Sequence, residues 1–270
     1  RLLADVPLGA VRSGGVDSST IVALMQAQSS RPVKTFTIGF HEEGYNEAKH
    51  ANAVAQYLGT DHTELYVSPT EALAVIPKLP SLYDEPFSDS SQIPTYLVAQ
   101  LTRRQVTVAL SGDGGDELFG GYGRYFRATR WWDMISRFPK GLRCLSGAII
   151  HKIPIAYWDR ISSLLRPLAP EKPLLLEGNK LHKSADLLKI FDRAKFYRSG
   201  FVSHWKGGEL VPGSTEPQTL LTKYGNNFPT LFEDMMALDA VTYLPDDTLV
   251  KADRAAMSVR RMTLLGLSPP

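Results

Sequence analysis

Seven residues near the start of the chain, Ser-Gly-Gly-Val-Asp-Ser-Ser at positions 13–19, restrict the possible folds more than any other stretch. A short apolar run ends just before them, and an amphipathic helical pattern begins at Ser18. A strand, a glycine loop and a helix in this order direct free backbone N–H groups and the positive end of the helix dipole toward an anion. The stretch therefore predicts the first unit of an α/β fold with an anion site at its loop.

The side chains of this loop favour a phosphate bound together with a metal ion. Glycines let the backbone approach a phosphate closely, and serines add hydroxyl donors. Asp17 is an acid where an anion is expected, and Mg²⁺ between the acid and the phosphate removes this conflict. The alternative is a turn whose Asp and Ser residues only cap the helix. The residues expected to bind the nucleotide are Ser13, Gly14, Gly15, Asp17, Ser18 and Ser19.

Composition excludes several other classes of protein. The chain has 270 residues, 43% of them hydrophobic and 21% charged, which is typical of a soluble globular protein with a substantial core. A net charge of +2 gives no reason to expect nucleic acid as a partner. The single Cys144 fits a reducing, cytoplasmic location, and no apolar run reaches the roughly 18 residues of a membrane span. Because the chain begins with Arg1, we expect it to be a piece of something longer.

Strand-like and helix-like segments alternate through the first part of the chain. Strands are expected at 6–11, 33–40, 62–67 and 106–110, with helices between them, including one at 94–105. The helix after the first loop is marked by Ile21, Leu24, Met25 and Gln28, and the next helix has Ala48, Ala51, Ala55 and Leu58 on one face with Gly59 as its stop. Residues 68–71 predict a capping box, and Leu73 and Ile76 supply the apolar side of the helix that follows. This alternation predicts an α/β fold with a mostly parallel sheet of about five strands and helices on both faces. Such sheets bind ligands at the carboxyl ends of their strands, and the segments after strands one, two and four fall there.

From residue 124 onward the pattern is helical. Residues 184–198 predict one amphipathic helix, and 207–219 predict a loop. We therefore expect an α/β core over 1–123, followed by a helical part that begins at residue 124.

A second glycine-rich and acidic stretch, Ser-Gly-Asp-Gly-Gly-Asp-Glu-Leu-Phe-Gly-Gly-Tyr, occupies residues 111–122, directly after the fourth expected strand. A solvated turn explains its composition but not its placement opposite the first loop. In the functional interpretation, Asp116 joins Asp17 on Mg²⁺. Asp113 or Glu117 lies near a reacting carbonyl in the same interpretation. Ser111 and Gly112 offer polar groups to the nucleotide.

The first loop resembles that of the N-type ATP pyrophosphatases, enzymes that cleave ATP between its α and β phosphates. Together, SGGVDSS, FTIGF, DEPF, SGDGGDELFGGY and DDTLVKADRAAM are similar to the synthetase domain of glutamine-dependent asparagine synthetase. The resemblance implies an adenine nucleotide alpha-hydrolase-like fold. It also implies that ATP activates a carboxylate, expected to be aspartate, as an acyl-adenylate that ammonia then attacks. The N-terminal glutaminase domain that supplies ammonia in that family is expected to be absent here, and a homodimer is possible.

The resemblance also implies roles for single residues. Val11 and Ile38 line the adenosine pocket, and the AMP contacts come from the second glycine-rich stretch. Asp113 stands where many asparagine synthetases have Glu beside the adenylated carboxylate. Lys251 and Arg254 are the candidate catalytic cations, on a helix that Asp246 or Asp247 is expected to cap.

The end of the chain departs from the family pattern. No match is recognised from Val259 on, and a frameshift or a truncated gene product is the expected cause. The resemblance thus implies a helical part over 124–258 and a tail outside the family pattern over 259–270. Two alternatives to an asparagine synthetase domain therefore stay open. One is an amidotransferase acting on another carboxylate, such as a sugar uronic acid. The other is an ATP-binding module without full activity.

Overall fold

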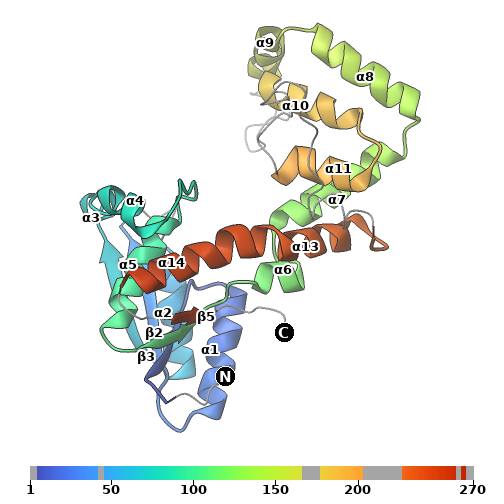
Figure 1. The fold of residues 1–270 in the computed structure, drawn as a ribbon. Helices are drawn as coiled ribbons and strands as arrows, with labels where there is room; N and C mark the ends of the chain where they lie inside the picture. Colours follow the sequence, from blue (N-terminus) through green and yellow to red (C-terminus); the bar gives the residue numbers. More distant parts are fainter. Residues whose placement is uncertain (1–4, 42–45, 166–176, 203–226, 260–262, 266–270) are drawn as a thin grey trace. The chain divides into compact units, whose positions relative to one another are not determined.

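The computed structural model describes residues 5–41, 46–165, 177–202, 227–259 and 263–265 (Figure 1). The chain forms two compact units. Unit 1 contains residues 1–119 and 242–270, and unit 2 contains residues 120–241. Residues 242–258 thus belong with the α/β part of the chain, although they lie far from it in sequence.

Unit 1 contains a sheet of five parallel strands in the order β3-β2-β1-β4-β5, which confirms the predicted fold class. Val11 of β1 lies opposite Phe36 of β2, and Phe36 lies opposite Thr63 of β3. β5 was not expected as a strand. It lies in the segment expected to be a tail and pairs in parallel with β4. The strands are β1 Leu8–Val11, β2 Lys34–Phe40, β3 Asp61–Val67, β4 Val108–Leu110 and β5 Thr263–Leu265.

Helices α1 (Val16–Gln28) and α2 (Ala48–Leu58) cover one face of the sheet. Val22 and Met25 of α1 pack there against Ala10, whereas Leu24, which we expected on the buried side, is 58% exposed. The helix itself was predicted correctly, but its buried side includes Val22 in place of Leu24. α2 buries its alanines as expected and ends at Gly59, whose φ of 69° is a left-handed conformation that glycine adopts freely.

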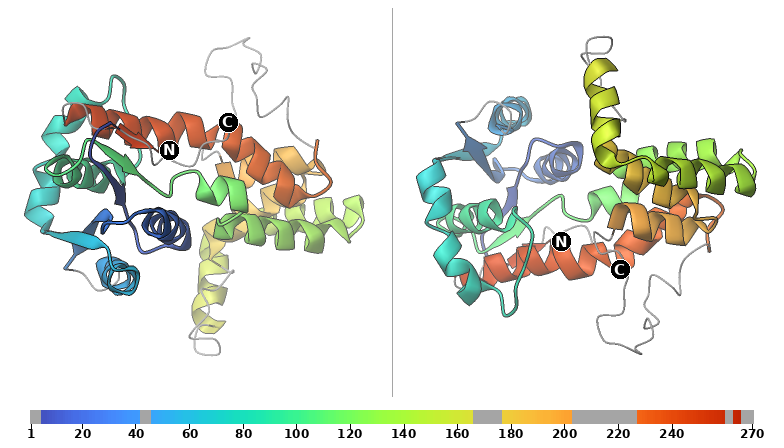
Figure 2. Two further views of the ribbon diagram at one scale, coloured as in Figure 1. Left: turned by 90° about the horizontal axis from the view of Figure 1, so that it is seen from below. Right: turned by 90° about the horizontal axis from the view of Figure 1, so that it is seen from above.

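Helices α5 (Gln92–Arg103) and α14 (Val250–Ser258) cover the opposite face (Figure 2). Phe36, Val98, Ala109 and Ala256 form part of the core between them and the sheet. Helices therefore lie on both faces of the sheet, as predicted. α14 continues directly from a π-helical segment, η5 (Leu244–Leu249).

Short helices connect β3 to α5: α3 (Pro69–Leu73), η2 (Ile76–Lys78) and α4 (Leu79–Leu82). The structure contains the capping box expected at the start of α3, where the Ser68 hydroxyl accepts from the backbone N–H of Glu71. The expected buried side of this segment is wrong, because Leu73 is 64% exposed and the neighbouring Val75 is buried instead.

Unit 2 is helical, as predicted. Its core includes Tyr125, Phe196, Tyr197 and Met235. The single helix expected over 184–198 is wrong, because one helix ends at Leu188 and the next begins at Arg193, where Asp192 caps it by accepting from the backbone N–H of Lys195. The loop expected at 207–219 lies outside the described residues. The helices are α7 Gly123–Ser136, α8 Lys140–Lys152, α9 Ile155–Leu165, α10 Gly178–Leu188, α11 Arg193–Tyr197, η4 Arg198–Val202 and α13 Leu231–Val241.

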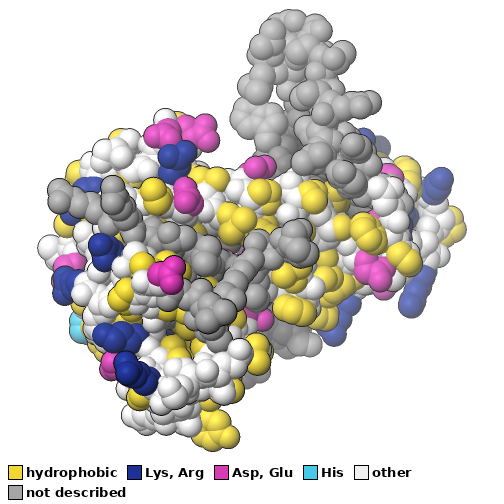
Figure 3. Space-filling view, turned by 60° about the horizontal axis from the view of Figure 1, so that its bottom comes forward, with side chains coloured by type: hydrophobic (Ala, Val, Ile, Leu, Met, Phe, Trp, Pro, Cys, Tyr) yellow, Lys and Arg dark blue, Asp and Glu magenta, His cyan; other side chains and the backbone are white. Residues whose placement is uncertain are grey.

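Acidic and basic side chains are interspersed on the face drawn in Figure 3, in keeping with the small net charge. Across the described ranges, no helix combines the length and the apolar character needed to cross a membrane.

Candidate functional site

The two glycine-rich loops touch each other at the carboxyl ends of the adjacent strands β1 and β4. A Cβ atom on Gly112 would lie 2.9 Å from the backbone nitrogen of Ser18, and one on Gly115 would lie 2.6 Å from Cγ of Asp17. Real Cβ atoms do not approach other atoms so closely, so both positions need glycine. The structure therefore brings the predicted loops together, and Asp17 lies against the residue that precedes Asp116.

The first loop is closed by its own hydrogen bonds. Gly14 has a φ of 84°, in the left-handed region. The hydroxyls of Ser18 and Ser19 donate to the carbonyl oxygen of Gly15, at 3.2 and 2.6 Å, and the Ser13 Oγ lies 3.3 Å from that of Ser18. Gly15 is the N-cap of α1, and no side chain caps that helix within the described chain. The alternative in which Asp and Ser merely cap the helix does not describe this loop.

The second loop leads into a short helix, α6 (Gly115–Phe119). The hydroxyl of Ser111 donates to Oδ2 of Asp113 at 2.7 Å. Asp116 and Glu117 lie in the first turn of α6, with Asp116 partly exposed and Glu117 buried at 2% exposure. Asp113 and Asp116 are thus the accessible acids of this loop, and the roles expected for them stay predictions.

The two residues expected beside adenosine share one face of the sheet. Val11 ends β1, and Ile38 lies in β2 two residues after Phe36, the partner of Val11 in the parallel register. Both side chains are partly buried against the cluster that contains Phe36. An apolar floor next to the first loop is what a purine ring would require.

Arg12 was not among the residues predicted from the sequence. It lies between β1 and the first loop and is only 1% exposed. Its Nη1 donates to the carbonyl oxygen of Ala51 in α2 at 2.7 Å, and its Nη2 donates to Oγ of Ser19 at 3.2 Å. Burial lowers the pKa of its guanidinium. A charged residue at the end of an apolar strand was the signal available in the sequence.

The two predicted catalytic cations are both paired with acids of the segment between α4 and α5. The Nζ of Lys251 lies 2.5 Å from Oδ2 of Asp89, and the Nη1 of Arg254 lies 2.7 Å from Oδ2 of Asp84. Within the described chain, neither cation forms an ion pair with either glycine-rich loop. Neither acid was predicted from the sequence, although Asp84 begins the DEPF motif and Asp89 closely follows it.

The helix cap expected for these cations is wrong. Asp246 and Asp247 lie inside η5, and the residue before α14 is Leu249 in a helical conformation without a side-chain cap. An uninterrupted turn of helix leaves no free N–H groups for a capping carboxylate to accept from.

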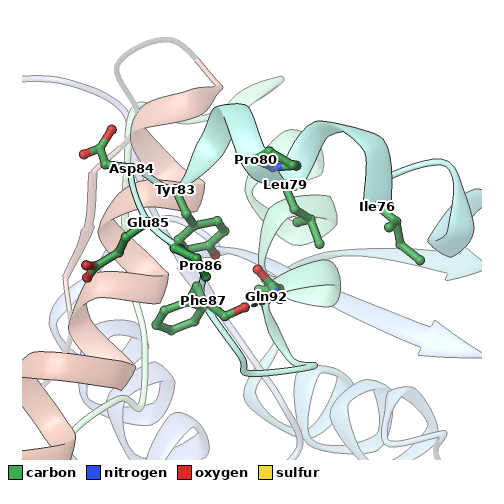
Figure 4. A pocket seen from close by; sticks show the side chains of 9 residues that line it. All are labelled: Ile76, Leu79, Pro80, Tyr83, Asp84, Glu85, Pro86, Phe87 and Gln92. Atoms are coloured by element: carbon green, nitrogen blue, oxygen red, sulfur yellow. Dashed lines mark hydrogen bonds between the residues drawn. The ribbon is translucent and has the colours of Figure 1, made fainter. Parts of the chain in front are cut away.

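The same segment forms one wall of a pocket of about 490 Å³ (Figure 4). Tyr83 and Phe87 stack in this wall with their ring centroids 4.8 Å apart, and Gln92 donates to the carbonyl oxygen of Phe87. The pocket is lined by Ile76, Leu79, Pro80, Tyr83, Asp84, Glu85, Pro86, Phe87 and Gln92.

A parallel α/β sheet with two glycine-rich loops in contact at the ends of neighbouring strands is consistent with the N-type ATP pyrophosphatase fold. A family model described as asparagine synthase matches residues 1–260. The chain belongs to the asparagine synthase family.

Curated relatives agree with this assignment. A putative glutamine-hydrolyzing asparagine synthetase 2 from Methanocaldococcus jannaschii is 42% identical over 261 residues, which are 95% of this chain and 46% of the relative. Asparagine synthetase 1 from Bacillus subtilis, also named glutamine-hydrolyzing, is 31% identical over 94% of this chain and 38% of its own length. A putative asparagine synthetase from Mycobacterium tuberculosis is 40% identical, with 94% and 36% covered. The chain thus spans less than half the length of these relatives.

Proposed function

We propose that this chain is the ATP-dependent synthetase part of a glutamine-hydrolysing asparagine synthetase. In this function a carboxylate, with aspartate as the expected substrate, attacks the α-phosphate of ATP and displaces pyrophosphate. Ammonia then attacks the acyl carbon, and the amide forms as AMP leaves. The contact between the two glycine-rich loops is the observation that carries the proposal, because it allows one triphosphate to touch both loops.

The residues present fit ATP and Mg²⁺. The start of α1 offers about half a positive charge, far less than the charge of ATP, so cations must supply the remainder. Asp17 and Asp116 would hold Mg²⁺, a cation that takes a few carboxylate oxygens together with phosphate oxygens and water. Among the residues that the structure describes, no group of three or more His, Cys, Asp or Glu residues could hold a metal ion. When bound, Mg²⁺ stabilises the charge on the departing pyrophosphate.

The protein side chains orient the reactants and move one proton. Ser111 and Gly112 bind the AMP portion, next to the floor formed by Val11 and Ile38. Asp113, held by the Ser111 hydroxyl, accepts a proton from the ammonia nitrogen as the C–N bond forms. We expect the protein to work in the cytoplasm and to receive ammonia from a glutaminase domain.

Pyrophosphate exchange provides the test. We expect ATP–Mg²⁺ with aspartate to support exchange of labelled pyrophosphate into ATP, and added ammonium to give asparagine. Asp17→Asn and Asp116→Asn should each lower exchange by at least 100-fold, whereas Asp133→Asn, an exposed acid on α7, should not change it. ATP binding without exchange would favour the binding module. Exchange with a uronic acid but not with aspartate would favour the other amidotransferase.

A further inference from the structure

Among the described residues, the guanidinium of Arg12 has only neutral hydrogen-bond partners. Within the described chain no carboxylate forms an ion pair with it, and its Nε is buried without a hydrogen-bond partner. Glu64, on the same side of the sheet, lies 3.6 Å from His62 instead. A buried cation without a counter-ion is costly, because the lost hydration is not replaced by an opposite charge.

Arg12 also holds the two elements that flank the first loop. Through Nη2 it binds Ser19 Oγ, which itself donates to the carbonyl oxygen of Gly15, and through Nη1 it binds Ala51 of α2. The loop lies against the same helix, because a Cβ on Gly14 would be 3.3 Å from the backbone nitrogen of Ala51. The charge is therefore fixed directly behind the loop by partners that are all neutral.

We infer that Arg12 is a positioning residue of the first loop, and that the polyphosphate of ATP is the counter-ion that its buried charge does not find among the described residues. This inference rests on the proposed function, and it adds a source of positive charge behind the loop. The anion need not touch the guanidinium. Two unit charges several ångströms apart in a partly buried site interact strongly enough to change affinity by about 10- to 100-fold.

The inference predicts opposite effects on the free and the nucleotide-bound protein. Arg12→Met removes an uncompensated buried charge, so the melting temperature of the nucleotide-free protein should stay unchanged or rise. The same change removes an attraction for phosphate, so the Kd for ATP–Mg²⁺ should rise by about 10- to 100-fold with a weaker salt dependence. If Arg12 had only a structural role, Arg12→Met would instead lower the melting temperature and leave the salt dependence of ATP binding unaltered.

Titration calorimetry and thermal melts of the whole chain, with and without ATP–Mg²⁺, test this inference. Arg12→Lys keeps the charge and should recover most of the affinity. Arg143→Met is the matched control, because Arg143 is also a buried arginine with an unpartnered Nε, bound to the carbonyl oxygen of Ile190 in unit 2. Its substitution should leave the Kd unchanged.

Two outcomes would overturn the inference: ATP affinity of Arg12→Met within twofold of the unchanged chain, or no recovery by Arg12→Lys. If the methionine variant does not fold, Arg12→Gln, which keeps an amide donor for Ala51 but no charge, replaces it in the same comparison. Failure of the unchanged chain to bind ATP would instead count against the proposed function, so the two ideas fail separately.

Discussion

Cγ of Asp17 lies 2.6 Å from the position that a Cβ atom on Gly115 would occupy, so α1 and α6 meet with no room for a methyl group between them. The acid of the first loop is thereby set beside the acids of the second. Residues almost a hundred positions apart in sequence depend on each other for their placement.

Gly115→Ala should separate these two loops. The methyl group would collide with Cβ and Cγ of Asp17, which lie close to the backbone and cannot swing away as the tip of a long side chain would. We expect a loss of about 1–3 kcal/mol in the free energy of unfolding and at least a 10-fold weaker ATP–Mg²⁺ affinity. Gly123→Ala is the control, because a Cβ there meets open space. Equal ATP affinity for the two variants in titration calorimetry would contradict the prediction.

The sequence was most informative where local rules decide the structure. The parallel sheet, the glycine end of α2 and the capping box at Ser68 all follow from periodicity and turn chemistry. The buried side of α1 could not be predicted in this way, because Leu24 and Val22 are both apolar and only tertiary packing decides which of them is buried.

The candidate site likewise contains features that local sequence rules predict and features that only the tertiary fold determines. The loops could be predicted because backbone approach demands glycine, and their contact followed from strand order. The ion pairs of Lys251 and Arg254 could not be predicted, because their acids come from residues more than 160 positions away. Arg12 was visible as a charge after an apolar strand, but only the fold shows that its partners in the described part of the chain are neutral.

The Asp89–Lys251 pair predicts a pH-dependent stability. Burial raises the pKa of Asp89, but hydrogen bonds from Lys251 and Ser91 together with the lysine charge outweigh it, and the pKa is lowered overall. A lowered carboxyl pKa stabilises the folded state above the ordinary value of 3.8, and this stabilisation is lost as the pH falls through the lowered value. Asp89→Asn should therefore cost about 1–2 kcal/mol at pH 7 and progressively less below pH 4.

Urea denaturation of both proteins at pH 7, 5 and 3 measures this difference. Asp133→Asn serves as the control, since Asp133 is exposed. A cost for Asp89→Asn that stays the same at pH 3 would show that the charge of Asp89 is not responsible.

Tyr83→Phe should stabilise unit 1. Tyr83 is 5% exposed and its ring stacks on Phe87, but its buried hydroxyl finds no hydrogen-bond partner among the described residues. Removing an unsatisfied hydroxyl while the ring stays in place is expected to gain about 1 kcal/mol. Burial, helped by the charges of Asp89 and Asp247, raises the pKa of Tyr83 to about 12.

This raised pKa gives the tyrosine prediction a second readout. Tyr83 ionises near its ordinary pKa of 10.0 in the unfolded chain but only toward about 12 in the folded state, because burial penalises the phenolate. The free energy of unfolding is therefore unaffected by this group below pH 10 and falls as the pH rises from 10 toward about 12. Between pH 10 and 12 the unchanged chain should therefore lose stability faster than Tyr83→Phe. Parallel pH profiles for the two proteins would contradict this account.

Asp239 is expected to be the most sensitive position of unit 2. Its Oδ2 accepts from Nη2 of Arg124 at 2.6 Å and from the hydroxyls of Tyr125 and Tyr197, each at 2.7 Å, while its side chain is 1% exposed. Burial and the nearby Asp239 charge raise the pKa of both tyrosines, which keeps them protonated as donors. Asp239→Asn removes the charge that balances Arg124, so we expect a loss of about 3–5 kcal/mol.

Tyr197→Phe removes one donor from this cluster and leaves the ion pair intact, so it should cost only about 1 kcal/mol. Guanidinium denaturation followed by tryptophan fluorescence suits the measurement, because Trp131 and Trp132 pack against the same core. The two substitutions test whether charge or hydrogen bonding holds α13 to α7 and α11 at this cluster. If Asp239→Asn cost no more than Tyr197→Phe, the hydroxyl contacts rather than the buried charge would carry the stability of this helical core.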